Sequence, residues 1–304
     1  MKTFLYLSSN IKGALFVVTG AFLLILMASL VKVLGQRLPA FEVLFVRFLS
    51  GLVVLLPLIL RAGLRKTLCT TKHSLHFARG GLGFMGNLCF FFSIIHIPLG
   101  DAVTIQFARP LFVILFAALI LKEVVGSNRK VVTLLGFCGI LMITQPFNAG
   151  FNPWMIVAVA GTFFGTGVVM TVKLLTRTEQ TVTIMFYFAL YTTICALIPG
   201  LAGYALKDDL ALPPSFIWIM PTWTELILLV LTGSLGIAGQ AMFTHGIGLG
   251  ETSFVVPFDY MRIVYAFIIG IIWFSEIPGF WSYAGALVIF GSSFYLLRTE
   301  SKKY

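Results

Sequence analysis

The chain has 304 residues, of which 59% are hydrophobic and only 11% are charged. A soluble domain carries about 25% charged residues, so this composition excludes an ordinary water-soluble fold. The formal net charge is +10, but the basic residues lie in short loops between apolar runs, which argues against nucleic acid as a partner. The apolar runs are about 20 residues long, enough to cross a hydrocarbon core. The sequence therefore predicts an all-α integral membrane protein with the lipid bilayer as its solvent.

Apolar length, punctuated by glycine, proline and charged residues, predicts ten transmembrane helices. The first apolar run is too long for a signal-peptide core and has no obvious small-residue cleavage site, so we interpret it as a retained helix. The expected helices are 12–35, 40–60, 76–95, 101–121, 130–146, 153–175, 181–205, 223–246, 252–274 and 279–297. Of the connections between them, 206–222 is the one long enough to be a real loop.

The basic residues also predict the orientation of the chain. With the N-terminus inside, nearly all loop Lys and Arg residues fall on the cytoplasmic side, and the opposite side holds only Arg37 and Lys207. An excess of Lys and Arg in cytoplasmic loops is the usual topology signal. We therefore expect a multi-pass protein of the inner membrane with both termini in the cytoplasm.

An internal repeat divides the ten expected helices into two halves. Sliding the sequence by 153 residues aligns 80–126 with 233–279 and places Arg109 on Arg262 and Glu123 on Glu276. Each half, 1–147 and 148–304, then holds five helices, and an odd number per half forces the halves into opposite orientations. Inverted repeats of this kind are typical of transporters that work by alternating access around a site near the midplane.

The cysteines and histidines indicate no metal site and no cofactor. The four cysteines, at positions 69, 89, 138 and 195, have no metal-ligand spacing, and most lie in apolar runs where a free thiol behaves as a small hydrophobe. His73 and His76 are expected in a cationic loop, and His96 and His245 at the ends of spans. Neither a nucleotide-binding loop nor a Ser/His/Asp arrangement is present in the sequence.

Several ordered motifs give the chain a family resemblance. Residues 41–48 (FEVLFVRF), the pair 110–112 (PLF) and 121–123 (LKE), and the stretch from 257–260 (PFDY) to 274–276 (FSE) resemble the EamA family of the drug/metabolite transporter superfamily. The resemblance implies ten helices, a central substrate cavity and transport of small metabolites such as amino acids. Within the family, Arg79-Gly80-Gly81 and Phe151-Asn152-Pro153 look most like bacterial S-adenosylmethionine uptake carriers.

The chain departs from the family pattern at two places. The acidic residues that end the fourth and ninth helices usually follow glycine, whereas here Lys122 and Ser275 precede them. Arg109 stands where the family commonly has a small or polar residue.

Five ionisable side chains fall inside expected spans, namely Lys32, Arg47, Arg109, Asp259 and Arg262. A charged residue at the centre of a membrane helix costs about 2.5–3.5 kcal/mol on insertion scales, so these groups must face one another, water or a ligand. Arg47 has two interpretations. It forms a structural ion pair with Glu42 or Asp259, or it binds the anionic group of a substrate through its two-pronged guanidinium.

Arg109 and Arg262 occupy equivalent positions in the repeats. Asp259 precedes Arg262 by three residues, so the two share a helix face and an ion pair between them is the simplest reading. That pair leaves Arg109 without an acidic partner. We hypothesise that Arg109 and Arg47 bind a carboxylate or similar anionic group of the substrate. Asp259 is also the candidate for proton coupling, with exchange against a counter-substrate as the alternative.

A second set of polar residues lies on the same helices or their repeat partners. We expect substrate contacts or interhelical hydrogen bonds from Gln106, Tyr260, Asn87, Gln240 and Tyr187. Glu123 and Glu276 are candidates for matching gates, with a purely interfacial role as the alternative. Lys32 and Lys173 lie near helix ends. There a lysine either extends its aliphatic chain so that the ammonium reaches the membrane interface, or contacts a ligand.

These observations favour a secondary active transporter for a small polar metabolite, an amino acid or another carboxylate-bearing compound, across the inner membrane by alternating access. S-adenosylmethionine uptake or exchange is the alternative that the resemblance suggests. A membrane-embedded enzyme acting on lipid-linked substrates is the alternative of another class. It requires a nucleophile or a cluster of acids and histidines at membrane depth, which the sequence does not show.

Overall fold

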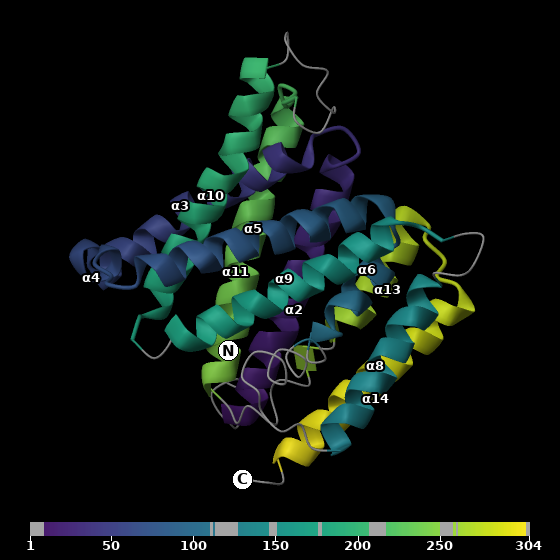
Figure 1. Cartoon of the computed structure of the whole chain (residues 1–304). Coiled ribbons are helices and arrows are strands. Elements are labelled where there is room, and N and C mark those ends of the chain that lie inside the picture. Colours follow the sequence, from purple (N-terminus) through teal and green to yellow (C-terminus); the bar gives the residue numbers. More distant parts are fainter. Residues whose placement is uncertain are drawn as a thin grey trace, which may run out of the picture. The chain divides into compact units, whose positions relative to one another are not determined.

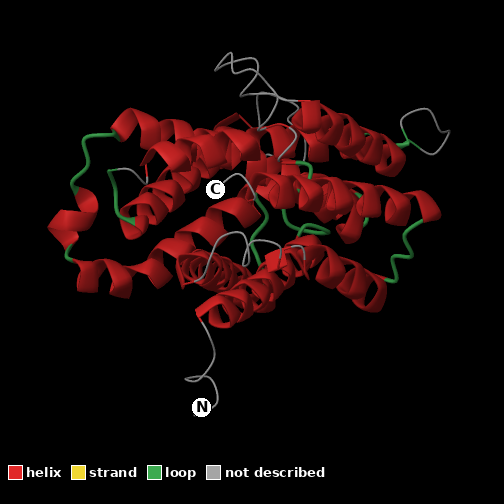
Figure 2. Cartoon of the chain, turned by 90° about the horizontal axis from the view of Figure 1, so that it is seen from below, coloured by secondary structure: helices red, strands yellow, loops and turns green. Residues whose placement is uncertain are grey.

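The structure is a computed structural model that describes residues 9–109, 112, 127–145, 151–175, 178–206, 217–249, 258–259 and 261–301. Within these ranges all regular structure is helical and no strand occurs (Figure 2). Six of the helices are long and apolar enough to cross a membrane, and three further apolar stretches are shorter, Leu134–Thr144, Met261–Phe274 and Phe280–Ser292. The prediction of a multi-pass helical membrane protein is confirmed at this level.

The described helices follow the expected order along the chain. They are α2 (Ser9–Leu34), α3 (Ala40–Ala62), α4 (Leu64–Leu68), α5 (His73–His96), α6 (Leu99–Gln106), α8 (Ser127–Thr144), α9 (Trp154–Leu175), α10 (Thr181–Leu206), α11 (Trp223–Leu249), α13 (Met261–Phe274) and α14 (Phe280–Ser301). Most of the expected helix 101–121 beyond Arg109, and most of 252–274 before Met261, lie outside the described residues.

One stretch differs from the sequence prediction. The expected cationic loop contains the short helix α4, and α5 begins at His73, so His73 and His76 are helical rather than in a loop. Their polar character marked them as loop residues, but a helix continues beyond its apolar segment when its first turns pack against a neighbour. Here the first turns of α5 pack on α10, where the His76 ring lies 4.6 Å from the Tyr187 ring between centroids.

The chain forms two compact units, each built from separate stretches of sequence. Unit 1 comprises Met1–Leu26, His96–Thr162 and Ala238–Tyr304, and unit 2 comprises Met27–Ile95 and Phe163–Ile237. Each unit therefore contains segments of both expected halves, 1–147 and 148–304. The division into those two halves remains a prediction from the repeat.

In unit 2, α3 packs along α10 (Figure 1), and small residues bring further helices close together. A Cβ added to Gly80 of α5 would lie 2.4 Å from the Cβ of Tyr191, and one added to Gly233 of α11 would lie 2.6 Å from the carbonyl oxygen of Arg47. Glycine is required at both places because any side chain would push the helices apart. The glycine series seen in the sequence thus serves close helix packing.

In unit 1, α6 packs against α13, and α8 runs beside α14 (Figure 1). The second contact is reciprocal. An added Cβ on Gly139 would lie 2.7 Å from Ile289, and one on Gly285 would lie 2.6 Å from Ile143. Each glycine thus faces the isoleucine four residues after the other glycine, as in a self-complementary interface around a two-fold axis.

Asn152 shapes the start of α9 in unit 1. Its side-chain oxygen accepts a hydrogen bond from the backbone N–H of Trp154 at 3.0 Å, which is the contact of a helix N-cap. Its amide nitrogen donates to the carbonyl oxygen of His96 at 3.1 Å, and the rings of His96 and Trp154 stack with centroids 4.0 Å apart. The Phe-Asn-Pro motif therefore joins the end of α5 to the start of α9.

Candidate functional site

Arg47 lies on α3 in a partly buried position within unit 2, surrounded by neutral groups. Its Nη1 donates a hydrogen bond of 3.2 Å to the side-chain oxygen of Asn87 on α5. The guanidinium carbon lies 4.6 Å from the ring centroid of Phe48 and 5.3 Å from that of Phe91. Gly236 of α11 also borders the guanidinium. A Cβ added at Gly236 would lie only 3.1 Å from Nη2, so a residue with a side chain would crowd the arginine.

No carboxylate pairs with Arg47 among the residues that the structure describes. Glu42, the neighbour on α3 considered as its partner, is 3% exposed and accepts a hydrogen bond of 3.0 Å from the backbone N–H of Ile219 instead. Cation–π contacts and one amide stabilise the guanidinium without neutralising it. The group therefore retains its full charge and suits an anionic ligand.

Unit 1 contains a second group of charges, which we call the Asp259 cluster (Arg109, Asp259 and Arg262). Asp259 and Arg262 form an ion pair with 2.7 Å between Oδ1 and Nε. Arg109 interacts electrostatically with both, and its Nε has no hydrogen-bond partner within the described residues. The expected Asp259–Arg262 ion pair is therefore present. Two guanidiniums and one carboxylate leave one positive charge in excess, and Arg109 is the arginine outside the pair.

The other predicted substrate contacts are distributed over both units. Asn87 is the one that meets a predicted arginine, since it accepts from Arg47 and donates from Nδ2 to the carbonyl oxygen of Gly83 at 2.7 Å. Gln106 ends α6 and Gln240 lies on α11, both in unit 1. Tyr260 lies outside the described residues. Substrate contacts for these residues remain a prediction.

Tyr187 faces a different set of partners in unit 2. Its hydroxyl donates to the carbonyl oxygen of Leu68 at 2.7 Å, and its ring contacts His76 and, in a stacked arrangement, Tyr191. Tyr187 thus ties α10 to the end of α4. A signal for this cluster was present in the spacing, because His73, His76 and Arg79 recur at intervals of three on one helix.

Of the two gate candidates, Glu276 is described and Glu123 lies outside the described residues. Glu276 follows α13, and its carboxylate accepts a hydrogen bond of 2.8 Å from the backbone N–H of Leu99, the first residue of α6. A carboxylate at a helix N-terminus satisfies an unpaired N–H and interacts favourably with the helix dipole. The side chain before it, Ser275, has φ +52°, a left-handed conformation that glycine adopts without strain.

Of the two lysines near helix ends, the structure describes the side chain of Lys32. Lys32, which belongs to unit 2, is 6% exposed. The side chain of Lys173 is outside the described set.

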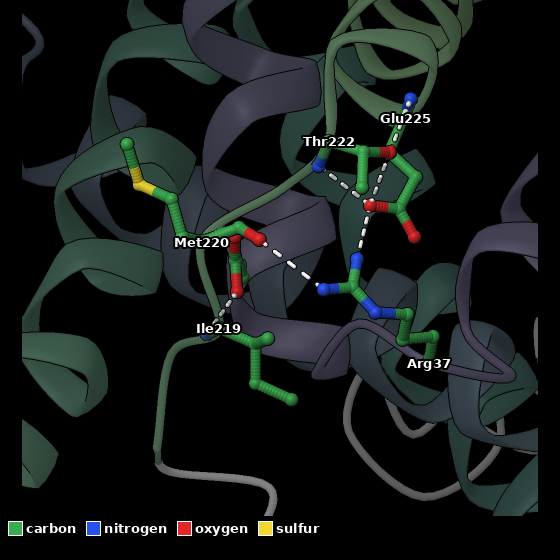
Figure 3. A network of polar contacts seen from close by, with 6 residues as sticks. Arg37, Ile219, Met220, Thr222 and Glu225 are labelled. Carbon is green, nitrogen blue, oxygen red and sulfur yellow. Dashed lines mark hydrogen bonds and ion pairs between the residues drawn. The ribbon is translucent and has the colours of Figure 1, made fainter.

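A polar network at the start of α11 was missed by the sequence analysis (Figure 3). Thr222 and Glu225 form a capping box, in which each backbone N–H donates to the other's side-chain oxygen, at 2.7 Å for Thr222 and 3.3 Å for Glu225. Arg37, in the turn between α2 and α3, forms an ion pair with Glu225 and donates to the carbonyl oxygen of Met220 at 3.3 Å. The Thr-x-x-Glu spacing was the available sequence signal, but nothing local indicated Arg37.

Asp101 is a second residue that the analysis overlooked. It stands in the first turn of α6 and is 3% exposed, so Asp259 is not alone as a buried acid in unit 1. No group of three or more His, Cys, Asp or Glu side chains suitable for a metal ion occurs in the described part of the chain.

Comparisons with known proteins agree with this architecture. The model of the EamA-like transporter family matches residues 11–145. The chain is 30% identical to an S-adenosylmethionine uptake transporter of Rickettsia bellii, over 93% of this chain and 94% of that protein. A riboflavin transporter of Brucella anthropi is 28% identical over 87% and 90%, and a pseudopaline exporter of Pseudomonas aeruginosa is 29% identical over 95% and 96%.

A solved crystal structure also has a similar fold, with a TM-score of 0.57 at 19% sequence identity, covering 94% of this chain and 98% of its own. The expected family resemblance is confirmed by the sequence matches. Because a relative at 30% identity matches over nearly its whole length, the chain belongs to the EamA-like transporter family and is a multi-pass membrane transporter rather than an enzyme.

Proposed function

We propose that this protein is a secondary active transporter that moves a small polar metabolite bearing a carboxylate, such as an amino acid or a related compound, across the inner membrane by alternating access. The observation that carries the proposal is the environment of Arg47. A guanidinium held by two rings and an amide, with no acid among its described neighbours, is an anion site kept ready for a ligand.

The packing within the units supports an inverted repeat. The three contacts α3 with α10, α6 with α13 and α8 with α14 join the second, fourth and fifth expected helices of one half to their counterparts in the other. Helices that lie next to a two-fold axis meet their own equivalents across it. The reciprocal Gly139–Ile289 and Gly285–Ile143 contacts have the same property at the level of single residues.

S-adenosylmethionine is the specific substrate to test first. The relative from Rickettsia bellii bears that name at 30% identity, and a carboxylate on the substrate would satisfy Arg47. The riboflavin and pseudopaline relatives have other cargoes at similar identity, so the screen must include several chemical classes. We further propose that both termini are cytoplasmic, on the strength of the loop charges.

The test combines ligand binding with transport. The purified protein is screened by thermal shift against amino acids, S-adenosylmethionine, nucleosides and organic acids, and each stabilising compound is then followed as a radiolabel into proteoliposomes. We expect a carboxylate-bearing compound to stabilise the protein and to accumulate. Stabilisation solely by compounds without an anionic group would contradict the proposed substrate class.

Substitution of each guanidinium separately tests the two candidate groups. Arg47→Gln is expected to weaken binding of the carboxylate ligand by about 30-fold, since a hydrogen bond to a charged group contributes about 2 kcal/mol. Arg109→Gln measures the contribution of the Asp259 cluster in the same way. Arg61→Gln is the matched control, because Arg61 is exposed at the end of the same helix as Arg47. Unchanged affinity and specificity in both variants would refute the assignment.

A further inference from the structure

A cluster of titratable side chains in unit 2 is separate from Arg47, and of its members only Tyr187 was considered as a substrate contact. It lies where the first turns of α5 meet α10, and we call it the His76 cluster. Its members are His73, His76, Arg79, Glu179 and Tyr187.

His76 is fully buried, with an exposed fraction of 0%. Neither ring nitrogen has a hydrogen-bond partner among the described residues. A neutral imidazole normally satisfies one donor and one acceptor when it is buried, so this side chain leaves both unmet. The ring is held in place by Tyr187, which lies against it at 4.6 Å between centroids with an interplanar angle of 33°.

The polar groups around His76 already form hydrogen bonds with other atoms. Arg79, one turn further along α5, donates from Nη1 to the carbonyl oxygen of Ile184 at 3.1 Å and lies 4.2 Å from the ring centroid of Phe188. Glu179, which precedes α10, accepts a hydrogen bond from the hydroxyl of Thr70. The hydroxyl of Tyr187 is bonded to Leu68.

The charges that act on His76 come from both sides of the contact. Glu179 favours a positive charge on the imidazole, whereas Arg79 and His73 on its own helix oppose one. Tyr191 and Cys69 interact electrostatically with Tyr187, which lies against the His76 ring. A proton on His76 would therefore create an imidazolium with two N–H donors, an acid nearby, and no acceptor in contact.

The exposed fraction of His76 is 0%, so bulk water does not reach the ring to supply that acceptor. An added Cβ on Gly80 would lie 2.4 Å from Tyr191, and one on Gly83 would lie 2.2 Å from Phe188, so α5 and α10 touch on the side of the cluster. A protonated His76 can be satisfied when Glu179 turns from Thr70 toward the ring or when the first turns of α5 move away from α10. Either change alters the packing of this face.

We propose that His76 is a proton-binding site of the transporter, and that taking up a proton from water onto a ring nitrogen opens the contact between the start of α5 and α10. Neutral His76 belongs to the packed arrangement, so that arrangement is favoured at high pH and disfavoured as the pH falls. Once the contact has opened and the ring meets water, an imidazole has its ordinary pKa of about 6.5, so the packed arrangement loses stability as the pH falls below about 6.5.

This inference extends the proposed transport function and rests on it only for its link to transport. The sequence made Asp259 the candidate for proton coupling, and that acid already shares its charge with Arg262 and Arg109. His76 has no described hydrogen-bond partner. A proton on His76 therefore adds a positive charge that no group in contact compensates, whereas Asp259 already lies between two arginines. The two candidates are separable by substitution.

The first experiment needs no substrate. Hydrogen–deuterium exchange of the full-length protein is measured for peptides covering 68–80 between pH 5.5 and 7.5, in the wild type and in His76→Phe, which keeps the ring contact with Tyr187 but cannot titrate. Dividing the exchange rate of the wild type by that of His76→Phe at each pH removes the intrinsic pH dependence of exchange. We expect the wild-type rate to rise about tenfold relative to His76→Phe at the acid end, since each pH unit below the titration midpoint shifts the balance by about tenfold.

His73→Gln is the matched control, because His73 is exposed on the same helix and contacts the same tyrosine edge-on. It should retain the acid response. His76→Gln gives a second non-titrating variant in case the phenylalanine disturbs folding. A wild-type ratio that stays flat across the range, or an acid response that persists in both His76 variants, would overturn the inference.

The second experiment addresses coupling. Uptake of the transported compound into proteoliposomes is followed with and without an imposed pH gradient in the wild type, His76→Phe and Asp259→Asn. Loss of the gradient effect in His76→Phe alone supports the inference, and loss in Asp259→Asn alone assigns coupling to the acid and refutes that part of it. If no compound is transported while the exchange response is present and depends on His76, the proposed function fails and the proton site stands.

Discussion

The guanidinium groups in the two units have different neighbours, neutral in unit 2 and charged in unit 1. In unit 2, Arg47 is surrounded by two aromatic rings and an amide, all neutral. In unit 1, Arg262 is paired with Asp259 at 2.7 Å and Arg109 lies in the field of both. An ion-paired arginine is compensated whether or not a ligand is present, whereas one with only neutral neighbours gains a counter-charge when an anion binds. The comparison supports the proposal that Arg47 binds the anionic group of the substrate, and it gives the Asp259–Arg262 pair a structural role to test.

The largest expected effect comes from breaking the pair in unit 1. Asp259→Asn leaves two guanidiniums without a carboxylate, and removal of one partner of a buried ion pair costs about 3 kcal/mol. We expect a clear fall in the thermal midpoint, measured by tryptophan fluorescence or calorimetry in detergent. The double variant Asp259→Asn/Arg262→Gln should recover part of the loss, because it also removes a stranded charge. Equal stability of wild type and Asp259→Asn would show that the pair contributes nothing.

The next prediction converts the unit 2 site into the unit 1 type. Asn87→Asp gives Arg47 a carboxylate at the position of its present amide partner. The protein without ligand should become slightly more stable, while affinity for a carboxylate-bearing ligand should fall by about 30-fold, a change of about 2 kcal/mol. Isothermal titration with the compound found in the screen gives the affinity. Binding as tight as in the wild type would mean that Arg47 does not contact the anion.

A third set of substitutions asks whether helix packing in the two units is equally tight. Gly285→Ala and Gly139→Ala in unit 1, and Gly80→Ala in unit 2, each place a Cβ within 2.7 Å of an existing atom. Overpacking of this kind costs about 1–3 kcal/mol, and the two reciprocal glycines of unit 1 should show similar losses.

The controls for these substitutions are the glycines with open space. A Cβ added to Gly291 in α14 or to Gly81 in α5 meets nothing within 4 Å, so Gly291→Ala and Gly81→Ala should be neutral or stabilising. Thermal midpoints of all five variants, measured side by side, decide the matter. A loss at the controls as large as at the packed positions would remove the argument from close approach.

The smallest expected effect is at Ser275, which precedes Glu276 in unit 1. Its φ of +52° is strained for a residue with a Cβ, so Ser275→Gly should raise the stability by about 0.5–1 kcal/mol. Ser234→Gly in the helical part of unit 2 is the matched control, and it should lower the stability by about the same amount. A change of the same sign at both positions would contradict the role of the left-handed backbone.

The helices were largely predictable because solubility in lipid is a local property of composition. The expected range 40–60 became Ala40–Ala62, and 223–246 became Trp223–Leu249. The start of α5 was predicted three residues too late, because His73 and His76 are polar and their aromatic contacts come from α10, more than a hundred residues further along the chain.

The candidate site was predictable as a set of residue types but not as a set of contacts. Charge in an apolar run identified Arg47 and Asp259, and spacing of three correctly paired Asp259 with Arg262. The partner of Arg47 was not evident, since Asn87 is 40 residues away and Glu42 looked equally suitable. Contacts between distant segments depend on tertiary packing, which leaves no local trace in a single sequence.

The two kinds of contact at the start of α11 form over very different distances along the chain. The Thr222–Glu225 capping box joins residues three apart, so it is able to form as soon as that segment is synthesised. Arg37 lies 188 residues before Glu225, so their ion pair cannot form until the chain between them has been made. The position of the turn between α2 and α3 against this helix end therefore depends on the folded chain of unit 2, whereas the capping box needs only four consecutive residues.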